Sequence, residues 1–175
     1  MNKLPTWSGV DWFGCDDDLV WEPLTKASGS PEQAAPARRV LILDVENVCP
    51  GSRRWRRAQS RLRAVLDAAG PVDQIIAASA ASQHERLDRL LRTMGVDVHR
   101  RVTNRPDAAD RALISAAREF AREGDCEVVV ASNDHSFRVI ARMPGVRRLV
   151  LITVPQLDTA RSLVRVASEL RVAAA

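Results

Sequence analysis

The fold is decided by the segment Arg39-Val-Leu-Ile-Leu-Asp44-Val-Glu46-Asn47-Val48, in which an apolar run ends at a carboxylate. A continuous run of β-branched and aliphatic residues is typical of a central strand that is covered on both faces. In an open α/β sheet, ligands bind at the carboxyl ends of the central strands. Asp44 is therefore expected to lie at a functional site, with the rest of the chain arranged around this strand.

Strand-like and helix-like segments alternate through the rest of the chain, which predicts a three-layer α/β sandwich with a mostly parallel sheet. Ser82 and Glu85 have the spacing of a capping box at the start of one helix. Glycine follows three of the expected helices, where it is a common stop signal. Further strands are expected at residues 72–79, 96–102, 127–131 and 146–154, and helices at 52–69, 82–94, 107–123, shortly after 137 and from about 159 to 172.

The net charge of +4 conceals a difference between the two parts of the chain. Residues 1–36 hold two lysines against six acids, a net charge of −4, so the remaining residues carry +8, nearly all of it from arginine. A compact basic domain is suited to polyanions, of which nucleic acid is the commonest. The charge is weak evidence by itself, because most surface arginines only contact solvent.

Residues 1–37 are predicted to form an acidic, tryptophan-containing tail and linker, and residues 38–175 the folded domain. The second half of the tail has linker composition, with little to bury. Its first half alternates aromatic and acidic residues, which leaves three interpretations open. The arm is flexible, its aromatic side chains pack on the domain, or they bind a protein partner.

The cysteines and the N-terminus predict a cytoplasmic protein with no membrane partner. Cys15, Cys49 and Cys126 are odd in number and lack metal-ligand spacing, as expected for reduced thiols. The N-terminus lacks the basic start and apolar core of a signal peptide. No apolar stretch approaches the roughly 20 residues that a membrane span needs.

Acidic residues are expected to gather at one edge of the sheet. Asp44 follows the first strand, Asp107 and Asp110 open the helix after the third strand, and Asp134 follows the fourth. Strand ends and helix starts of a parallel α/β sheet meet at that edge, where grouped carboxylates repel unless a cation joins them. Oxygen ligands suit Mg²⁺ or Mn²⁺. A structural interpretation stays open for Asp107 and Asp110 as a helix cap, and for Asp134 as a cap of the next helix.

Other kinds of site are disfavoured by the sequence. There is no glycine-rich phosphate loop after the first strand and no serine in a nucleophile elbow. His84, His99 and His135 are not paired with cysteine or glutamate at ligand spacing, and His84 is expected to lie exposed in a first helical turn. A phosphatase of the haloacid dehalogenase type needs a second aspartate two residues after the first, where this chain has Glu46.

Three motifs occur in a fixed order around the acidic residues. They are Leu43-Asp44-Val-Glu-Asn47, Asp107-Ala-Ala-Asp110-Arg-Ala-Leu113 and Val130-Ala-Ser-Asn-Asp134-His-Ser136-Phe137. The ordered set resembles the signatures of NYN domains, a family of PIN-like, metal-dependent ribonucleases, over residues 38–172. This resemblance implies a five-stranded, Rossmann-like α/β/α domain of strand order 3-2-1-4-5, with an acidic cup at the carboxyl edge of the sheet.

The resemblance also implies roles for individual residues. Asp44, Asp110 and Asp134 would bind Mg²⁺ or Mn²⁺, and Asn47 would orient the site or the substrate. Many members of the family carry a further aspartate where this chain has Ser136. Asp107 is the candidate to replace that missing ligand.

The implied activity is endoribonuclease hydrolysis of phosphodiester bonds in single-stranded RNA. Four arginines crowd the positive end of the helix expected after Asp44, so a negative partner such as RNA phosphate is expected nearby, with a solvated face as the alternative. Trp55 is expected either to stack on a base or to pack in the core. The candidate phosphate-binding residues are Arg53, Arg54, Arg56 and Arg57, with Arg100, Arg101 and Arg105 on the opposite rim.

A second function, from another class, fits the same sequence. The absence of a fourth acid at Ser136 is also expected of a catalytically weak PIN-like module that binds RNA or a protein partner. In that case the tail at residues 1–37 would supply specificity. The three retained carboxylates favour the enzyme.

Overall fold

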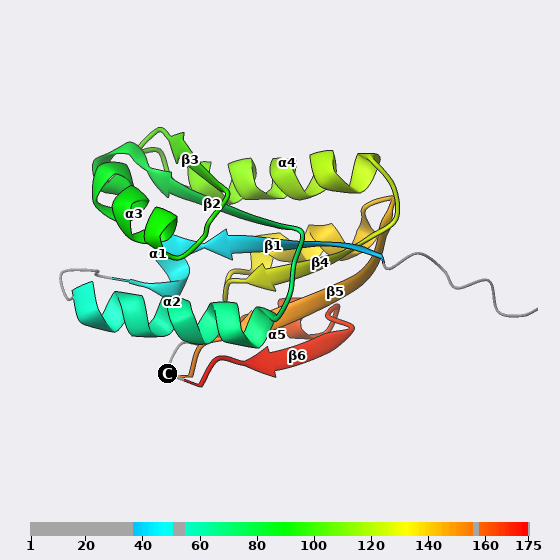
Figure 1. Cartoon of the computed structure of the whole chain (residues 1–175). Coiled ribbons are helices and arrows are strands. Elements are labelled where there is room, and N and C mark those ends of the chain that lie inside the picture. The colour runs from blue at the N-terminus through cyan, green and yellow to red at the C-terminus, as the bar shows by residue number, and fades with distance from the viewer. Residues whose placement is uncertain (1–36, 51–54, 156–157, 175) are drawn as a thin grey trace, which may run out of the picture. The chain divides into compact units, whose positions relative to one another are not determined.

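The chain forms a parallel α/β sheet with helices on both faces, as the computed structural model shows for residues 37–50, 55–155 and 158–174 (Figure 1). Six strands pair in the order β3-β2-β1-β4-β5-β6 within this part of the chain. The five strands predicted from the sequence are present in the predicted order, and β6 is an addition at one edge. The strands are β1 (Arg38–Asp44), β2 (Gln74–Ala80), β3 (Val98–Val102), β4 (Cys126–Ala131), β5 (Val146–Thr153) and β6 (Glu169–Val172).

The helices divide between the two faces of the sheet. On one face, α2 (Trp55–Ala69) and α3 (Ala81–Thr93) bury leucine, valine and alanine side chains against the strands, beside the short α1 (Val45–Val48). On the other face, α4 (Ala108–Arg122), the 3₁₀ helix η1 (His135–Arg142) and α5 (Arg161–Val164) form a second buried cluster. No helix in the described ranges is both long enough and apolar enough to cross a lipid bilayer.

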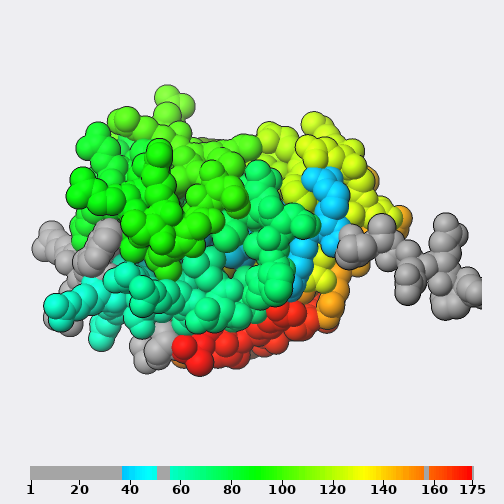
Figure 2. Space-filling view, in the orientation of Figure 1, coloured from blue at the N-terminus to red at the C-terminus, as the bar shows by residue number. Residues whose placement is uncertain are grey.

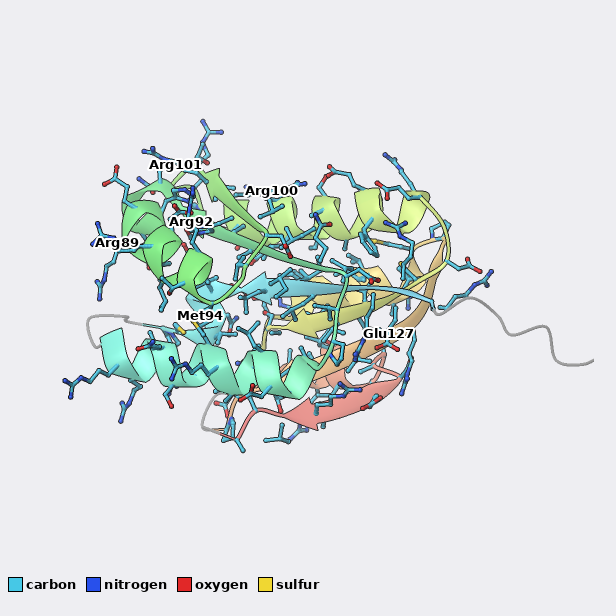
Figure 3. All side chains as sticks on the ribbon, in the orientation of Figure 1. Arg89, Arg92, Met94, Arg100, Arg101 and Glu127 are labelled. Atoms are coloured by element: carbon cyan, nitrogen blue, oxygen red, sulfur yellow. The ribbon has the colours of Figure 1, made fainter. Side chains whose placement is uncertain are left out.

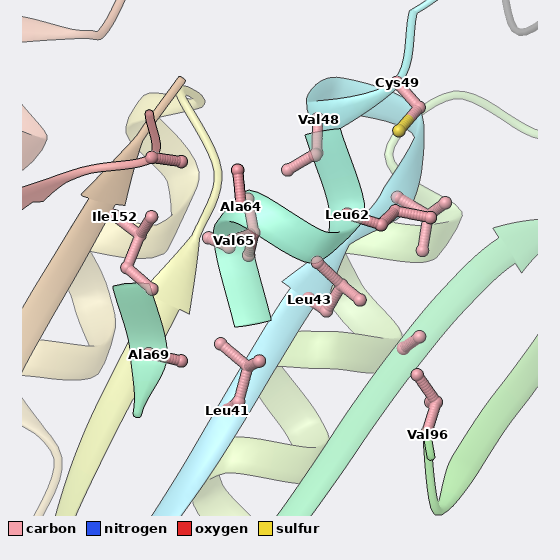
Figure 4. Close-up of a cluster of buried hydrophobic side chains, with 14 of the residues drawn as sticks. Leu41, Leu43, Val48, Cys49, Leu62, Ala64, Val65, Ala69, Val96 and Ile152 are labelled. Atoms are coloured by element: carbon pink, nitrogen blue, oxygen red, sulfur yellow. The ribbon is translucent and has the colours of Figure 1, made fainter. Parts of the chain in front are cut away.

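β1 connects the two cores, as its apolar run predicts. Residues 40–43 are completely buried, and successive side chains point to opposite faces of the strand. Leu41 and Leu43 pack under Leu62 and Val65 of α2 (Figure 4). Ile42 belongs to the opposite cluster, around α4. Each of these side chains leaves water fully, and burying one aliphatic side chain stabilises the fold by roughly 1.5–3 kcal/mol.

The strand register determines which residues meet at the carboxyl edge of the sheet. β1 pairs with β4 so that Leu43 lies beside Ala131, and it pairs with β2 so that Asp44 lies beside Ala78. The residues that follow β1 and β4 therefore leave the sheet side by side at its carboxyl edge. Asp44 and Ser132 are the first polar residues there.

The C-terminal segment differs from the helix predicted from about 159 to 172. It contains only the short α5, followed by β6, which pairs in parallel with β5. The open edge of β5 supplies backbone partners that override the helical pattern of the sequence. β6 lies along α2 at the rim of the molecule (Figure 2), and Arg171 Nη1 donates to the carbonyl oxygens of Ala68 and Ala69 at 2.9 and 3.0 Å.

The start of α3 also differs from the prediction. The helix begins at Ala81, one residue before Ser82, and no side chain caps it, so Ser82 and Glu85 do not form a capping box. The N–H group of Ser82 instead donates to Asn104 Oδ1 at 3.0 Å, in the loop that follows β3. A group from a neighbouring loop thus satisfies a free N–H of the first turn. The predicted tail, residues 1–37, lies outside the described residues except for Ala37.

Candidate active site

Asp44 is the most constrained carboxylate of the predicted site. Its side chain caps α1, because Oδ1 accepts the N–H of Asn47 at 3.1 Å. Its other oxygen, Oδ2, accepts the hydroxyl of Ser132 at 2.8 Å. The residue is 2% exposed, and burial raises its pKa, against the lowering effect of these two hydrogen bonds. The sequence did not predict α1, so this capping role of Asp44 is a finding of the structure.

The end of β4 is bonded to the end of β1 through side chains. Ser132 Oγ, besides donating to Asp44, accepts the N–H of Asp134 at 3.1 Å. Asn133 Nδ2 donates to Asn47 Oδ1 at 3.2 Å, and Thr159 Oγ1 donates to Asn133 Oδ1 at 2.7 Å. Ser132 and Asn133 are buried, so these bonds fix the two strand ends relative to each other.

Asp110 lies in the first turn of α4 and is half-buried. Burial and the negative charges of Asp44, Asp134, Asp107 and Glu46 raise its pKa to about 6. Asp44, Asp107 and Asp110 line one pocket, and Ser132 joins Asp44 to the backbone of Asp134, so these acidic groups gather at the carboxyl edge. A carboxylate surrounded by like charges is stabilised by binding a proton or a cation.

Asp134 has the capping role that was one of the two interpretations of this residue. Its Oδ1 accepts the N–H of Ser136 at 2.7 Å and so caps η1, as the structural interpretation predicted. Its side chain remains 36% exposed, with His135 Nδ1 at 3.4 Å from Oδ1. Ser136 Oγ is buried and has no hydrogen-bond partner among the described residues. A buried hydroxyl without a partner is uncommon and marks this position for a test.

The acidic pocket is a cavity of about 420 Å³ between the end of β1 and the start of α4. Glu46 also lines it, and its Oε1 accepts the N–H of Ala80 at 2.7 Å. Glu46 was not predicted as a site residue, although its position two residues after Asp44 was a usable signal. Asp134 is not among the lining residues. Those that carry charge or a side-chain amide are Asp44, Glu46, Asn47, Asn104, Arg105, Asp107 and Asp110.

Asp107 occupies the N-cap position of α4 but does not cap it. No hydrogen bond joins its side chain to the helix, so the capping interpretation of this residue is wrong. Its backbone has φ 55°, a left-handed conformation that is uncommon for residues other than glycine. Asp107 is exposed, lines the pocket and makes no capping hydrogen bond, so its carboxylate is available as a metal ligand or a substrate contact.

The candidate phosphate-binding arginines are divided between separate places. Arg105 is exposed and lines the acidic pocket, whereas Arg56 lines a different depression on α2 with Arg63 and Asp67. Arg57 is exposed on the first turn of α2. Arg100 is paired with Glu119 of α4 at 2.8 Å, and Arg101 is exposed. Arg53, Arg54 and the side chain of Trp55 lie outside the description.

A second cluster was missed in the sequence. His84 and Asp88 of α3 meet His99 of β3, and one ligand atom from each lies within 4.8 Å of the others. His84 is partly buried rather than exposed as predicted. The four-residue spacing of His84 and Asp88 on one helix was the available signal. Within the described part of the chain, this is the only group of three or more potential ligands that close together, and the acidic residues of the pocket are further apart.

Comparison with known proteins adds evidence on the fold. No protein-family model and no curated protein sequence matches this chain. A crystal structure of a protein of unknown function, VPA0982 from Vibrio parahaemolyticus RIMD 2210633, is similar with a TM-score of 0.56 at 22% sequence identity. The match covers 80% of this chain and 95% of that one. At this identity the similarity shows a shared parallel α/β fold.

Proposed function

We propose that the chain is a metal-dependent ribonuclease of the NYN, PIN-like kind, with its active site at the acidic pocket. The observation that carries this proposal is that three distant segments bring carboxylates to the carboxyl edge of the sheet: Asp44 and Asp110 line one pocket, and Ser132 connects Asp44 to Asp134 beside it. None of the three forms an ion pair with arginine or lysine among the described residues, and only His135 lies beside Asp134. Structural carboxylates usually have such partners, whereas ligands of a cation do not need them.

The donor set suits Mg²⁺ or Mn²⁺, because it consists of carboxylate oxygens with Asp107 and Glu46 nearby. Asp44, Asp110 and Asp134 would hold the ion, and the exposed Asp107 would complete the site. Each oxygen of Asp44 accepts one hydrogen bond and keeps a second lone pair for a ligand. A bound cation would supply activation of water and neutralisation of the charge that develops on the phosphate.

The chain's own residues would orient the reaction. Asn47 and Ser132 hold the Asp44 carboxylate in one position through hydrogen bonds to both of its oxygens. Arg105, at the rim of the pocket, would bind a phosphate next to the scissile one. In the hydrolysis, a water oxygen loses a proton and bonds to phosphorus, the bond from phosphorus to the leaving oxygen breaks, and the leaving oxygen takes up a proton.

Single-stranded RNA is the favoured substrate, because the pocket is open and the domain is rich in arginine. We expect no membrane partner, and we place the protein in the cytoplasm. The tail at residues 1–37 is a candidate site for a protein partner. The test is incubation of the purified full chain with end-labelled single-stranded RNA, with Mn²⁺ in one arm and a chelator in the other.

Internal cleavage that requires the metal is the expected result. RNA that is bound but left intact at every metal concentration would overturn the enzyme and support the binding module instead. The observation that favours this second function is Ser136, a hydroxyl where related nucleases are expected to carry a carboxylate.

A further inference from the structure

The contact between α3 and β3 contains a compact group of imidazole and carboxylate side chains. His84 and Asp88 are four residues apart on α3, so they lie on the same face of the helix. The ring of His84 stacks on the ring of His99 from β3, with 4.1 Å between centroids and 20° between planes. His99 Nδ1 lies 3.2 Å from Asp88 Oδ1. Ligand atoms from the three residues all lie within 4.8 Å of one another.

One ring nitrogen of this group is left without a partner. The Nδ1 atom of His84 is buried and has no hydrogen-bond partner in the described part of the chain. The side chain of His99 is 3% exposed. Buried polar atoms in proteins are bonded in the large majority of cases, and the exceptions frequently mark an ion or an ordered water. This nitrogen lies beside a second imidazole and a carboxylate, and in the tautomer protonated on Nε2 it is available as a metal ligand.

The surrounding residues orient the two inner ligands. His99 Nε2 lies 2.7 Å from the hydroxyl of Ser79, which is completely buried on β2. In the metal-free protein a proton on Nδ1 can be donated to Asp88, and when zinc binds, the proton can lie on Nε2 and be donated to Ser79, which frees the Nδ1 lone pair for the ion. Arg92 Nε donates to Asp88 Oδ2 at 2.7 Å, so that Oδ1 faces His99. Metal-binding histidines almost always make such a hydrogen bond with their second nitrogen, and ligating carboxylates are held in the same manner.

We propose that His84, Asp88 and His99 bind one Zn²⁺ ion. Two imidazole nitrogens and one carboxylate oxygen form a frequent ligand set for zinc, with bonds of about 2.0–2.2 Å and a fourth position for water. Tetrahedral geometry at these lengths separates neighbouring ligand atoms by roughly 3.3 Å. His99 Nδ1 and Asp88 Oδ1 already have this separation. The ring of His84, a partly buried residue, would have to turn out of its stack on His99 to direct a nitrogen at the same ion.

Charge around the cluster opposes cation binding only weakly. Arg89, Arg92 and Arg101 lie around α3 and β3 and are exposed (Figure 3), so solvent screens Arg89 and Arg101. Arg92 is ion-paired with Asp88 and offsets part of the charge of that carboxylate. The nearby Glu85 is an exposed acid on the same helix. Zinc differs from the ion of the acidic pocket, because imidazole nitrogen is a poor ligand for Mg²⁺.

The proposed ion would clamp α3 onto the sheet. Its ligands come from a helix and a strand, and Ser79 adds a contact from β2. The next residue, Ala80, donates its N–H to Glu46 and lines the acidic pocket. Zinc at this position would therefore rigidify one wall of that pocket without entering it. The proposal does not rest on the ribonuclease function.

The test is zinc titration of the full chain against a chromophoric zinc chelator, with a non-thiol reductant and millimolar Mg²⁺ to occupy the acidic pocket. One equivalent of tightly bound zinc and a higher melting temperature are expected. His84→Ala should weaken zinc binding at least about 100-fold, since loss of a ligand exceeds the 10–100-fold cost of losing a group behind it. His135→Ala is the matched control, because the third histidine is exposed beside Asp134.

A second variant and a second readout keep the test decisive. Asp88→Asn leaves both rings in place and should also lose zinc affinity, while circular dichroism confirms that each variant is folded. In proton NMR of the wild type, ring signals of His84 and His99 should shift at one equivalent of zinc, and those of His135 should not. Equal zinc affinity in the wild type and in His84→Ala, or no tight zinc binding by the wild type, would overturn the proposal.

Discussion

The acidic pocket and the His84–Asp88–His99 cluster are both candidate metal sites, yet opposite forces arrange their side chains. In the pocket, like charges from the end of β1 and the start of α4 repel, with Asp134 beside them, and hydrogen bonds from Ser132 and Asn47 hold Asp44 in place. In the cluster, the ligands attract one another directly, through the contact between His99 and Asp88 and the stacked rings. The cluster is therefore the tighter group, within 4.8 Å, and the acidic residues stand further apart.

Distances between potential ligands have a different meaning in the two sites. Carboxylates do not approach closely until a cation removes their repulsion, so a wider spacing is what an acidic site is expected to have before it binds metal. A mixed group of imidazoles and a carboxylate approaches on its own through hydrogen bonds. Short distances are thus weaker support for the cluster than they first suggest, and the unpartnered Nδ1 of His84 is the stronger argument.

The largest effect is expected from Asp44→Asn. This substitution removes the central charge of the acidic pocket and should lower the rate of RNA cleavage at least about 10³-fold, as loss of a group that stabilises developing charge does. Burial raises the pKa of Asp44, so removing its charge favours the metal-free variant, whereas asparagine has one acceptor oxygen fewer for the bonds from Asn47 and Ser132. These effects oppose each other, and the stability in chelator should stay close to that of the wild type. Cleavage of labelled single-stranded RNA in Mn²⁺ and urea unfolding in chelator are the two measurements.

Asp67→Asn is the matched control, because Asp67 is an exposed acid on α2 and lines a different depression. The same assays sharpen the comparison between the two sites. Zinc affinity of Asp44→Asn should equal that of the wild type, since no ligand of the cluster changes. Wild-type cleavage rates in Asp44→Asn would end the assignment of the acidic pocket as an active site.

Ser136→Asp should have the next largest effect. It adds a carboxylate beside Asp134, where the hydroxyl of Ser136 is now buried and unpartnered among the described residues. We expect about tenfold tighter Mn²⁺ binding and faster cleavage at low metal concentration, because added ligand charge strengthens sites for hard cations. In the absence of metal, the additional like charge should lower the free energy of unfolding.

Calorimetric titration of Mn²⁺ into both proteins measures this prediction. Ser60→Asp, at an exposed position of α2, adds the same charge away from the pocket and should change neither quantity. If Ser136→Asp also leaves metal affinity and cleavage unchanged, position 136 does not face the site. The active enzyme would then depend on three carboxylates and Asp107.

Much of the acidic pocket was predictable from the sequence, because a single rule of parallel sheets places strand ends and helix starts together. That rule predicts the positions of Asp44, Asp110 and Asp134 at one edge once the strand order is assumed. The role of Ser132 does not, since a serine after a strand has many uses and only the register of β1 and β4 places its hydroxyl on Asp44. Glu46 could have been found from its position two residues after Asp44.

The missed elements depended on contacts between segments that are distant in the sequence. β6 exists because β5 offers an open edge, and the pattern of its own residues also suits a helix. His99 joins His84 and Asp88 only because β3 turns that side chain toward α3, which a one-residue change of register would reverse. Local sequence patterns predicted the elements whose own apolar faces determine their structure, such as β1 and α4. They did not predict the elements whose structure depends on a neighbouring strand or helix.

The pH dependence of stability separates the two regions, because their titrating groups act in opposite directions. The folded-state pKa of Asp110 is about 6, above its unfolded value. The contribution of Asp110 to the free energy of unfolding of the metal-free protein therefore increases as pH falls from 7 through 6 toward 4. His99 has a pKa lowered by burial, so its contribution is lost as pH falls below the ordinary histidine range. The pH dependence of the free energy of unfolding of the wild type is the sum of these two contributions, so single-residue variants are needed to separate them.

Asp110→Asn isolates the acidic contribution. In chelator at pH 7 the variant should be more stable than the wild type by about 1 kcal/mol, after allowance for solvent screening of a half-buried carboxylate. Near pH 4.5 most of this difference should disappear, because Asp110 of the folded wild type is then protonated. Urea unfolding at the two pH values measures it. A difference that is the same at both would show that Asp110 does not experience the charges of Asp44, Asp134, Asp107 and Glu46.

The smallest effect is expected from Arg105→Gln, which tests whether the acidic pocket and not another surface receives the RNA. Arg105 is the arginine that lines the pocket, so it should contact one phosphate of the bound strand. Losing one contact should reduce the slope of log affinity against log salt concentration by roughly 0.7 for a single strand. Arg63→Gln removes the same charge from the separate depression on α2 and is the matched control.

Fluorescence anisotropy with labelled single-stranded RNA, over a series of salt concentrations and with Ca²⁺ in place of Mn²⁺ to suppress cleavage, gives both slopes. A reduced slope for Arg105→Gln with an unchanged slope for Arg63→Gln places the strand across the acidic pocket. The reverse result would move RNA to α2, beside Arg56 and Arg57, and would separate RNA binding from the carboxylates. Equal small changes in both variants would mean that these arginines only add to the general positive potential of the domain, which acts on any polyanion without placing it.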